Sequence, residues 1–145
     1  GMKVIAFDLI KNKTFLELFP KMTFTKNIED IYTHSDVISL HIPHTTKTEK
    51  LINLDVIFNK LKKCPIIINT ARGMLVDVDA IIDGLSKKKI TGYLTDVLAN
   101  EPIEENEKLK GIPNVIITPH VGSRTFQSVV RQGTMAVENL LKSIN

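Results

Sequence analysis

The sequence predicts an α/β protein built on a doubly wound, mostly parallel β-sheet. Short apolar runs of strand length alternate with segments of helical periodicity from the first residues to the last. Most of the short runs are apolar at successive positions, which is typical of strands covered by helices on both faces. The 145 residues are enough for one domain with a substantial hydrophobic core.

The expected strands are short and apolar, and several of them end at a polar or charged residue. They cover residues 4–7, 22–25, 37–42, 66–69, 91–95 and 115–118. Helices are expected between them, each after a residue whose side chain accepts a hydrogen bond from a free backbone N–H. The expected caps and helices are Asn27 for 27–34, Asn53 for 54–63, and Asp77 for a helix that ends near Lys88.

The longest expected helix follows Thr125, which we interpret as its N-cap. Its apolar side chains fall on one stripe, formed by Phe126, Val129, Val130, Val137, Leu140, Leu141 and Ile144. Gly133 lies on the same stripe, where the absence of a side chain would permit a close approach of the helix to the sheet.

Composition favours a soluble protein of a reducing, cytoplasmic compartment. We expect no transmembrane helix and no signal sequence, because the chain has neither a long apolar run nor a charged leader followed by one. The one cysteine, Cys64, has no internal partner for a disulfide. The net charge of +3 is spread along the chain, so neither nucleic acid nor a membrane is expected as a partner.

Three histidines, His34, His41 and His44, lie close together in the sequence. Their spacing fits no compact set of metal ligands, so we expect ordinary surface or strand-end histidines. No metal site is expected in this chain.

Charged and titratable residue types follow several of the expected strands at the point where each strand ends. They are Asp8, His41, Arg72, Asp96 and His120. The carboxyl ends of parallel strands meet at one edge of a sheet, and ligands of doubly wound folds bind there. We therefore expect a binding or catalytic site along this edge.

Four stretches of the chain resemble the D-isomer-specific 2-hydroxyacid dehydrogenases: SDVISLHIPHTTKTEKLIN, IIINTARGMLVDVDAIIDGL, GYLTDVLANEP and NVIITPHVGSRT. They occur in the family's order and with family-like spacing. The resemblance implies a Rossmann-like NAD-binding domain of an oxidoreductase that moves a hydride between nicotinamide and a small 2-hydroxy or 2-keto acid. It also implies that residues 1–145 are a partial NAD-binding domain, without the substrate domain.

The resemblance assigns catalytic roles to three residues. Arg72 matches the arginine that binds the substrate carboxylate, a task that suits the permanently charged, two-pronged guanidinium. His120 matches the acid–base that exchanges a proton with the substrate oxygen. Glu101 matches the carboxylate that orients this histidine and stabilises its protonated form.

Cofactor-binding positions transfer in the same way. Asp8 resembles the carboxylate that holds the adenosine ribose, and its charge would repel a 2′-phosphate, so NAD is expected rather than NADP. The other matching positions are Ile42 and Pro43 on the adenosine side, Thr48 over the nicotinamide, Thr70 as a backbone contact, and Asp96 for the nicotinamide carboxamide.

The glycine-rich phosphate loop of dinucleotide-binding folds is not found in the sequence. The 7 glycines are scattered singly and form no G-x-G-x-x-G. We expect the first strand, this loop and the first helix to be missing ahead of Gly1. The missing strand would lie between the strands 4–7 and 37–42 in a sheet of order 3-2-1-4-5-6. The isolated chain is then expected to bind NAD weakly and to be inactive.

Two further hypotheses stay open beside the dehydrogenase: a non-enzymatic remnant that folds and associates, and one half of a split enzyme. In each case the strands 4–7 and 37–42 would present unpaired edges. These edges could pair with each other or with a second molecule. We expect association, as a homodimer.

Overall fold

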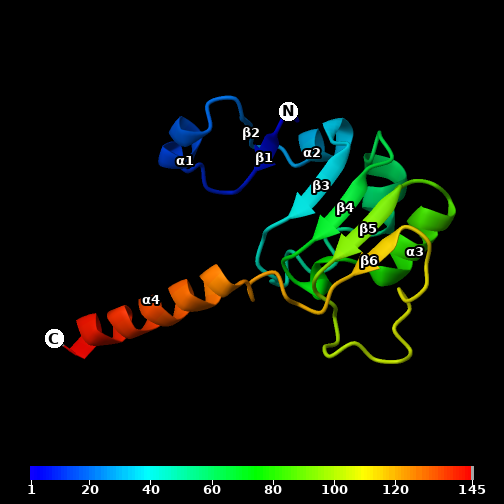
Figure 1. The fold of residues 1–145 in the computed structure, drawn as a ribbon. Coiled ribbons are helices and arrows are strands. Elements are labelled where there is room, and N and C mark those ends of the chain that lie inside the picture. The colour runs from blue at the N-terminus through cyan, green and yellow to red at the C-terminus, as the bar shows by residue number, and fades with distance from the viewer. Residues whose placement is uncertain (145) are drawn as a thin grey trace.

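The computed structural model describes residues 1–144. Its elements follow one another in alternation along the chain, as drawn in Figure 1. They are β1 (Ile5–Phe7), α1 (Lys13–Leu18), β2 (Thr23–Thr25), α2 (Glu29–His34), β3 (Val37–Leu40), the π-helical η1 (Val56–Lys60), β4 (Ile66–Asn69), the 3₁₀ turn η2 (Gly73–Leu75), α3 (Val78–Ser86), β5 (Gly92–Thr95), β6 (Val115–Ile117) and α4 (Phe126–Ile144).

All strand pairs are parallel, which confirms the predicted α/β class. Strands β3, β4, β5 and β6 form one sheet in that order, and β1 and β2 form a separate pair. In residues 1–144, no strand lies between β1 and β3, and these two strands do not pair with each other. The sheet order is therefore the expected one with a gap at the expected place.

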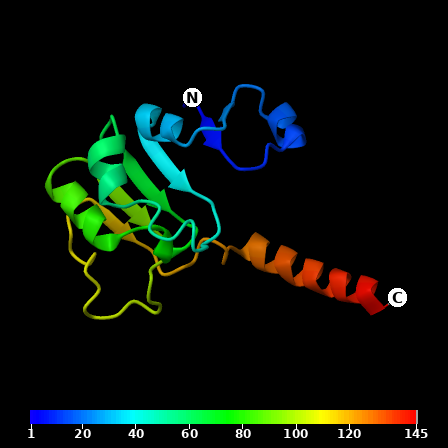
Figure 2. The same cartoon turned by 180° about the vertical axis from the view of Figure 1, so that it is seen from behind.

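Helices cover one face of the four-stranded sheet. Figure 2 shows α3 and η1 in front of the strands, with α2 beside them. Alternate strand residues point into this layer, and the opposite face carries no helix in the described part of the chain (Figures 1 and 2). This differs from the expectation of helices on both faces, because α4 does not return to the sheet.

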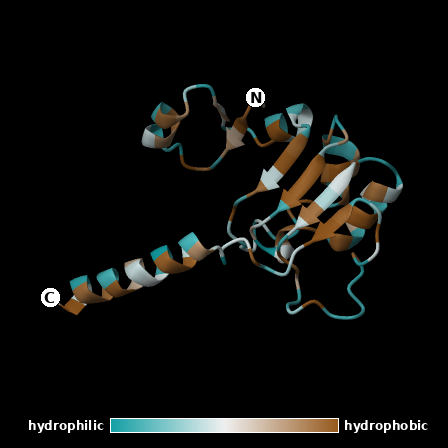
Figure 3. Cartoon of the chain, in the orientation of Figure 1, coloured by the Kyte–Doolittle hydropathy of each residue, from teal (hydrophilic) through white to brown (hydrophobic). Residues whose placement is uncertain are grey.

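Helix α4 begins where the sequence predicts, with Ser128 N donating to Thr125 Oγ1 at 3.2 Å. It then runs away from the sheet, and none of its residues is buried. A Cβ added at Gly133 would meet no atom within 4 Å. The expectation that Gly133 brings this helix close to the sheet is therefore wrong within one chain. Figure 3 shows the apolar side of α4 and the apolar strands of the sheet.

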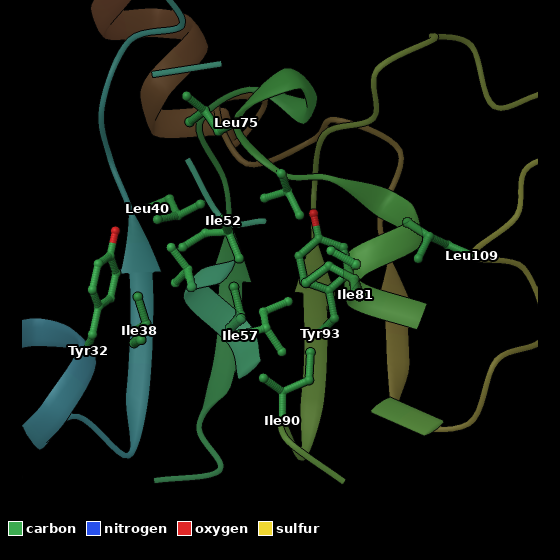
Figure 4. Packing of buried hydrophobic residues seen from close by; sticks show 14 residues of the cluster. Tyr32, Ile38, Leu40, Ile52, Ile57, Leu75, Ile81, Ile90, Tyr93 and Leu109 are labelled. Atoms are coloured by element: carbon green, nitrogen blue, oxygen red, sulfur yellow. The ribbon is translucent and has the colours of Figure 1, made fainter. Parts of the chain in front are cut away.

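The core lies between the sheet and its helices, as Figure 4 shows. Ile38, Ile67 and Tyr93 occupy neighbouring register positions on β3, β4 and β5. They pack with Ile57 of η1 and Ile81 of α3, and all five are at most 4% exposed. The close packing of these five buried side chains fixes the positions of the strands. The candidate active site described below is built on the carboxyl ends of these strands.

Two further predicted caps, besides Thr125, start their helices as expected. Asp77 accepts from Asp79 N at 3.1 Å, and Asn53 accepts from Val56 N at 3.1 Å. The helix after Asn53 is shorter than predicted and π-helical, because Leu61 N donates to the oxygen of Val56, five residues back. Helix α1, which starts after Asn12, was not predicted. No helix of residues 1–144 has the length and apolarity needed to span a membrane.

Candidate active site

The carboxyl ends of β4, β5 and β6 lie side by side, because Asn69, Thr95 and Ile117 share one register row. The turns that follow these strands therefore emerge at the same edge of the sheet. They contain Arg72 after β4, Asp96 after β5 and His120 after β6.

A pocket of about 320 Å³ opens at this edge. It is lined by Arg72, Gly73, Val97, Leu98, Ala99, Glu101 and His120. The structure thus brings the three residues predicted to be catalytic into one cavity, although they lie far apart in the sequence.

His120 and Glu101 form a hydrogen-bonded pair, with His120 Nδ1 2.6 Å from Glu101 Oε2. Glu101 Oε1 also accepts from Leu98 N at 2.8 Å, which holds the carboxylate in place. The hydrogen bond to His120 and the one from Leu98 keep the pKa of Glu101 below its usual value. Nδ1 is occupied, so Nε2 is the nitrogen that His120 offers to a ligand.

The backbone at His120 is in the left-handed region, with φ of 53°. For a residue with a side chain this conformation is uncommon and strained, and such strain is concentrated at functional sites. The side chain of Asp96 holds this turn in place. Its carboxylate accepts from Val121 N at 3.0 Å, from Gly122 N at 2.7 Å and from the Thr118 hydroxyl.

Asp96 is only 8% exposed. Desolvation raises the pKa of its carboxyl, but the hydrogen bonds from Thr118, Gly122 and Val121 outweigh it and bring the pKa below the usual value. A carboxylate has about four acceptor positions, so three donors leave one for an amide such as that of nicotinamide. Sequence reasoning missed the anchoring of the His120 turn, for which the neighbouring Thr118 and Gly122 were the available signal.

The turn that carries Arg72 is held by a buried amide that sequence reasoning also missed. Asn69 is fully buried; its Nδ2 donates to Arg72 O at 2.9 Å and its Oδ1 accepts from Ala71 N at 3.1 Å. The guanidinium is exposed, and Nη1 donates to Ala71 O at 2.6 Å. Most of the donors of Arg72 therefore face the pocket or solvent.

Gly73 allows this turn to touch the loop that carries Glu101. A Cβ added at Gly73 would lie 2.1 Å from the carbonyl carbon of Leu98 and 2.3 Å from Ala99 N. Both contacts are with backbone, so a side chain here would push the two loops apart. The glycine therefore sets the separation between Arg72 and Glu101.

The residues expected on the cofactor side lie outside this pocket. Asp8 follows β1, is exposed, and accepts from Ile10 N at 3.0 Å. Thr48 lies in the loop after β3 and donates to Pro43 O at 2.8 Å. Ile42 contacts the core, and Thr70 is exposed directly after β4.

These residues fit two ends of a dinucleotide. Asp8 offers an exposed carboxylate to a ribose diol, and Asp96 has one acceptor position toward an amide. Nothing in residues 1–145 supplies the glycine-rich turn that binds a pyrophosphate. The residues present therefore fit the ribose and nicotinamide ends of NAD, but a glycine-rich turn for its pyrophosphate is not among them.

The clustered histidines are engaged separately. His41 Nε2 lies 2.8 Å from Ser39 Oγ, and His34 Nδ1 lies 2.8 Å from Thr33 Oγ1. Across residues 1–144, no group of His, Cys, Asp and Glu side chains is arranged to hold a metal ion.

Comparison with known proteins agrees with this geometry. Residues 1–122 match the family described as "D-isomer specific 2-hydroxyacid dehydrogenase, NAD binding domain". A glyoxylate reductase of Thermofilum pendens is 34% identical over 140 residues, which cover 97% of this chain and 41% of that protein. A D-lactate dehydrogenase of Lactobacillus delbrueckii subsp. bulgaricus is 36% identical over 157 residues, which cover 99% of this chain and 46% of that protein.

Solved structures show the same relationship. The NAD-complexed D-isomer specific 2-hydroxyacid dehydrogenase from Lactobacillus delbrueckii ssp. bulgaricus superposes with a TM-score of 0.85 at 31% identity, over 99% of this chain and 46% of that one. The chain thus spans less than half the length of these relatives. It belongs to the D-isomer specific 2-hydroxyacid dehydrogenases and corresponds to their NAD-binding domain.

Proposed function

We propose that this chain is the NAD-binding portion of an oxidoreductase that transfers a hydride between nicotinamide and C2 of a small 2-hydroxy or 2-keto acid. The observation that carries the proposal is the pocket in which Arg72, Glu101 and His120 meet. NAD, when bound, supplies the hydride chemistry. The chain's own residues then bind the acid and move one proton.

Arg72 is proposed to bind the substrate carboxylate. The guanidinium has five N–H donors in a planar fork, and only Nη1 has a partner within the described residues, the oxygen of Ala71. The remaining donors can take both oxygens of a carboxylate, and the charge polarises the neighbouring carbonyl.

His120 is proposed to exchange the proton with the substrate oxygen through Nε2. Glu101 Oε2 lies 2.6 Å from Nδ1, and this contact orients the ring so that Nε2 can face the substrate oxygen. In the oxidative direction the same Nε2 takes the hydroxyl proton.

The cofactor positions remain proposals of the same kind. We propose Asp8 for the adenosine ribose, Ile42 and Pro43 for the adenosine side, and Thr48, Thr70 and Asp96 for the nicotinamide end. The carboxylate of Asp8 favours NAD over NADP. Residues 1–145 are proposed to form a partial NAD-binding domain, with the substrate domain outside them; the share of each relative that the chain covers supports this.

A chimera tests the proposed function. Residues 1–122 would replace the matching segment of the Lactobacillus delbrueckii D-lactate dehydrogenase, and NADH oxidation would be followed with glyoxylate, pyruvate and hydroxypyruvate. We expect turnover with at least one of these 2-keto acids, and Arg72→Ala should remove it. A chimera that folds, binds NADH and turns over none of them would favour the non-enzymatic remnant.

We also propose that the chain forms a homodimer in the cytoplasm. The unpaired edges of β1 and β3 support association, because open strand edges pair readily with another chain. The single, exposed Cys64 fits a reducing compartment. Light scattering at concentrations well above micromolar would show the mass of a dimer.

A further inference from the structure

Thr95 is the last residue of β5, and its hydroxyl lies in the interior of the protein. The residue is 3% exposed, and a buried hydroxyl is unfavourable unless it is hydrogen-bonded. Thr95 Oγ1 accepts from Val97 N at 3.2 Å, and Val97 O lies 2.6 Å away as an acceptor. The hydroxyl has one hydrogen, and the shorter distance favours Val97 O over Asn69 O, which is 3.2 Å away. The hydroxyl therefore binds both backbone groups of Val97.

Val97 begins the loop that carries Glu101. Val97 is 2% exposed, and together with Leu98 it lines the pocket. Leu98 N donates to Glu101 Oε1 at 2.8 Å, so the carboxylate is tied to the backbone directly after Val97. The other oxygen, Oε2, lies 2.6 Å from His120 Nδ1. A displacement of Val97 would therefore move Leu98, and the carboxylate with it.

The same end of β5 also positions the other member of the pair. Thr118 N donates to Thr95 O at 2.9 Å, which fixes the end of β6 just before His120. Asp96 accepts hydrogen bonds from the backbone of the turn that follows. Two adjacent residues of one strand end thus hold the two loops, Thr95 the loop of Glu101 and Asp96 the turn of His120.

The surroundings of Thr95 exclude water. Tyr93 points to the same side of β5 as Thr95, two residues along, and is 2% exposed. Figure 4 shows its hydroxyl directed toward the carboxyl ends of the strands. Burial raises the pKa of the Tyr93 hydroxyl, as expected where water is scarce. Hydrogen bonds are stronger in such surroundings, and the loss of one is not compensated by solvent.

We propose that the Thr95 hydroxyl is a positioning group for the Glu101–His120 pair: by fixing Val97, it holds the Glu101 carboxylate against Nδ1 of His120 and leaves Nε2 to face the substrate oxygen. The bonds that carry this effect all join residues between 95 and 120. Thr95 is buried behind the loop and acts only through Glu101. The catalytic meaning of this role rests on the proposed function, whereas the positioning itself does not.

Nitrogen-15 NMR of the His120 ring in the complete chain tests the positioning without any turnover, with the signals assigned from His120→Gln. A carboxylate only accepts hydrogen bonds, so contact with Glu101 keeps the ring proton on Nδ1. In alkaline solution imidazole is neutral, and the two nitrogen shifts report which nitrogen carries the proton. We expect Thr95→Val to lower the ratio of the Nδ1–H to the Nε2–H tautomer by roughly 3- to 10-fold, the loss of about one hydrogen bond expressed as a population ratio.

Thr95→Ser is the rescue variant, because it keeps the hydroxyl and removes only the methyl group. It should retain the parent ratio of tautomers even where it lowers the stability of the chain. Thr91→Val is the matched control: it makes the same exchange just before β5, where the exposed Thr91 hydroxyl donates to Cys64 O at 3.2 Å. It should leave the ratio unchanged. If Thr95→Val does not fold, Thr95→Ala against Thr95→Ser gives the same comparison, since both lack the methyl group and differ in the hydroxyl.

An unchanged tautomer ratio in Thr95→Val overturns the proposal. A ratio that falls equally in Thr95→Ser overturns it too, because packing of the methyl group would then be the cause. In an active chimera, Thr95→Val should displace the same limb of the pH profile as Glu101→Ala and lower kcat, with little change in the KM of the keto acid, because Arg72 keeps its own anchor in Asn69. A chimera without turnover refutes the proposed function, and the tautomer ratio still decides the role of Thr95.

Discussion

Asp96→Asn should release the turn that presents His120 while leaving the core folded. The carboxylate accepts three hydrogen bonds from this turn, at Val121 N, Gly122 N and the Thr118 hydroxyl. An asparagine side chain keeps one oxygen acceptor, and its amide group would face the N–H of Gly122 at the position now held by Oδ2, where the distance is 2.7 Å. Loss of one charge-assisted bond and weakening of the others should cost about 2–3 kcal/mol.

Amide hydrogen exchange measures this loss where it occurs. In Asp96→Asn we expect faster exchange at Val121 and Gly122 by roughly 30- to 150-fold, which is the same free energy expressed as a rate ratio. Exchange at Leu94 in β5 should be unchanged, because the core does not depend on this bond. Asp36→Asn is the control, since that carboxylate is 80% exposed and, among residues 1–144, is bonded to Lys63 alone.

The same bonds predict an acid-sensitive turn. The pKa of Asp96 is lowered in the folded protein, so its carboxylate stabilises the turn at pH values above the unfolded pKa of about 4. That contribution is lost as the pH falls through the lower, folded pKa. Protection at Gly122 should therefore fall in strongly acidic solution in the parent chain and change less in Asp96→Asn. Equal protection of Gly122 in both proteins at neutral pH would refute the anchoring role.

Further outcomes follow from the glycines, the catalytic residues and the phosphate site. Gly73→Ala should lower the free energy of unfolding, measured by urea denaturation, by about 3 kcal/mol, because the added Cβ would press on the backbone of Leu98 and Ala99. Gly133→Ala should stabilise α4 by about 0.5–1 kcal/mol, because alanine favours the helix more than glycine does. In an active chimera, Arg72→Ala should nearly abolish turnover, and His120→Ala should remove one limb of the pH profile. Glu101→Ala should only displace that limb; an unmoved profile would contradict the pairing of Glu101 with His120. Calorimetry should detect no tight binding of NADH to the isolated chain, because residues 1–145 contain no glycine-rich phosphate loop. A micromolar dissociation constant would show that other residues of the chain bind the pyrophosphate.

Local signals predicted most of the elements. The strand over 66–69 has the expected bounds, because an apolar run is read directly from neighbouring residues. Asp77 and Thr125 start their helices as expected, since a capping bond spans only two or three residues. The helix over 54–63 was predicted too long because hydrophobic periodicity does not distinguish an α-helical turn from a π-helical one.

The parts that could not be predicted depend on contacts between distant residues. The donors to Asp96 lie 22, 25 and 26 residues further along the chain. Strand order explains these contacts, because the pairing of β5 and β6 brings Asp96 to the turn that carries His120. The bonds of Asn69 are different: they are local, reaching Ala71 and Arg72, but an asparagine at a strand end has no pattern in the sequence that predicts them.

The site and helix α4 share one mechanical link. Between Asp96 and α4 the chain passes through His120, Val121 and Gly122, so the bonds that impose the left-handed backbone at His120 also set the direction in which α4 leaves the sheet. Release of the turn would give α4 more orientations relative to the sheet. Asp96→Asn should therefore broaden the distribution of distances between a spin label on α4 and one on β4, as well as free His120. An unchanged distribution in that variant would show that other contacts set the direction of α4.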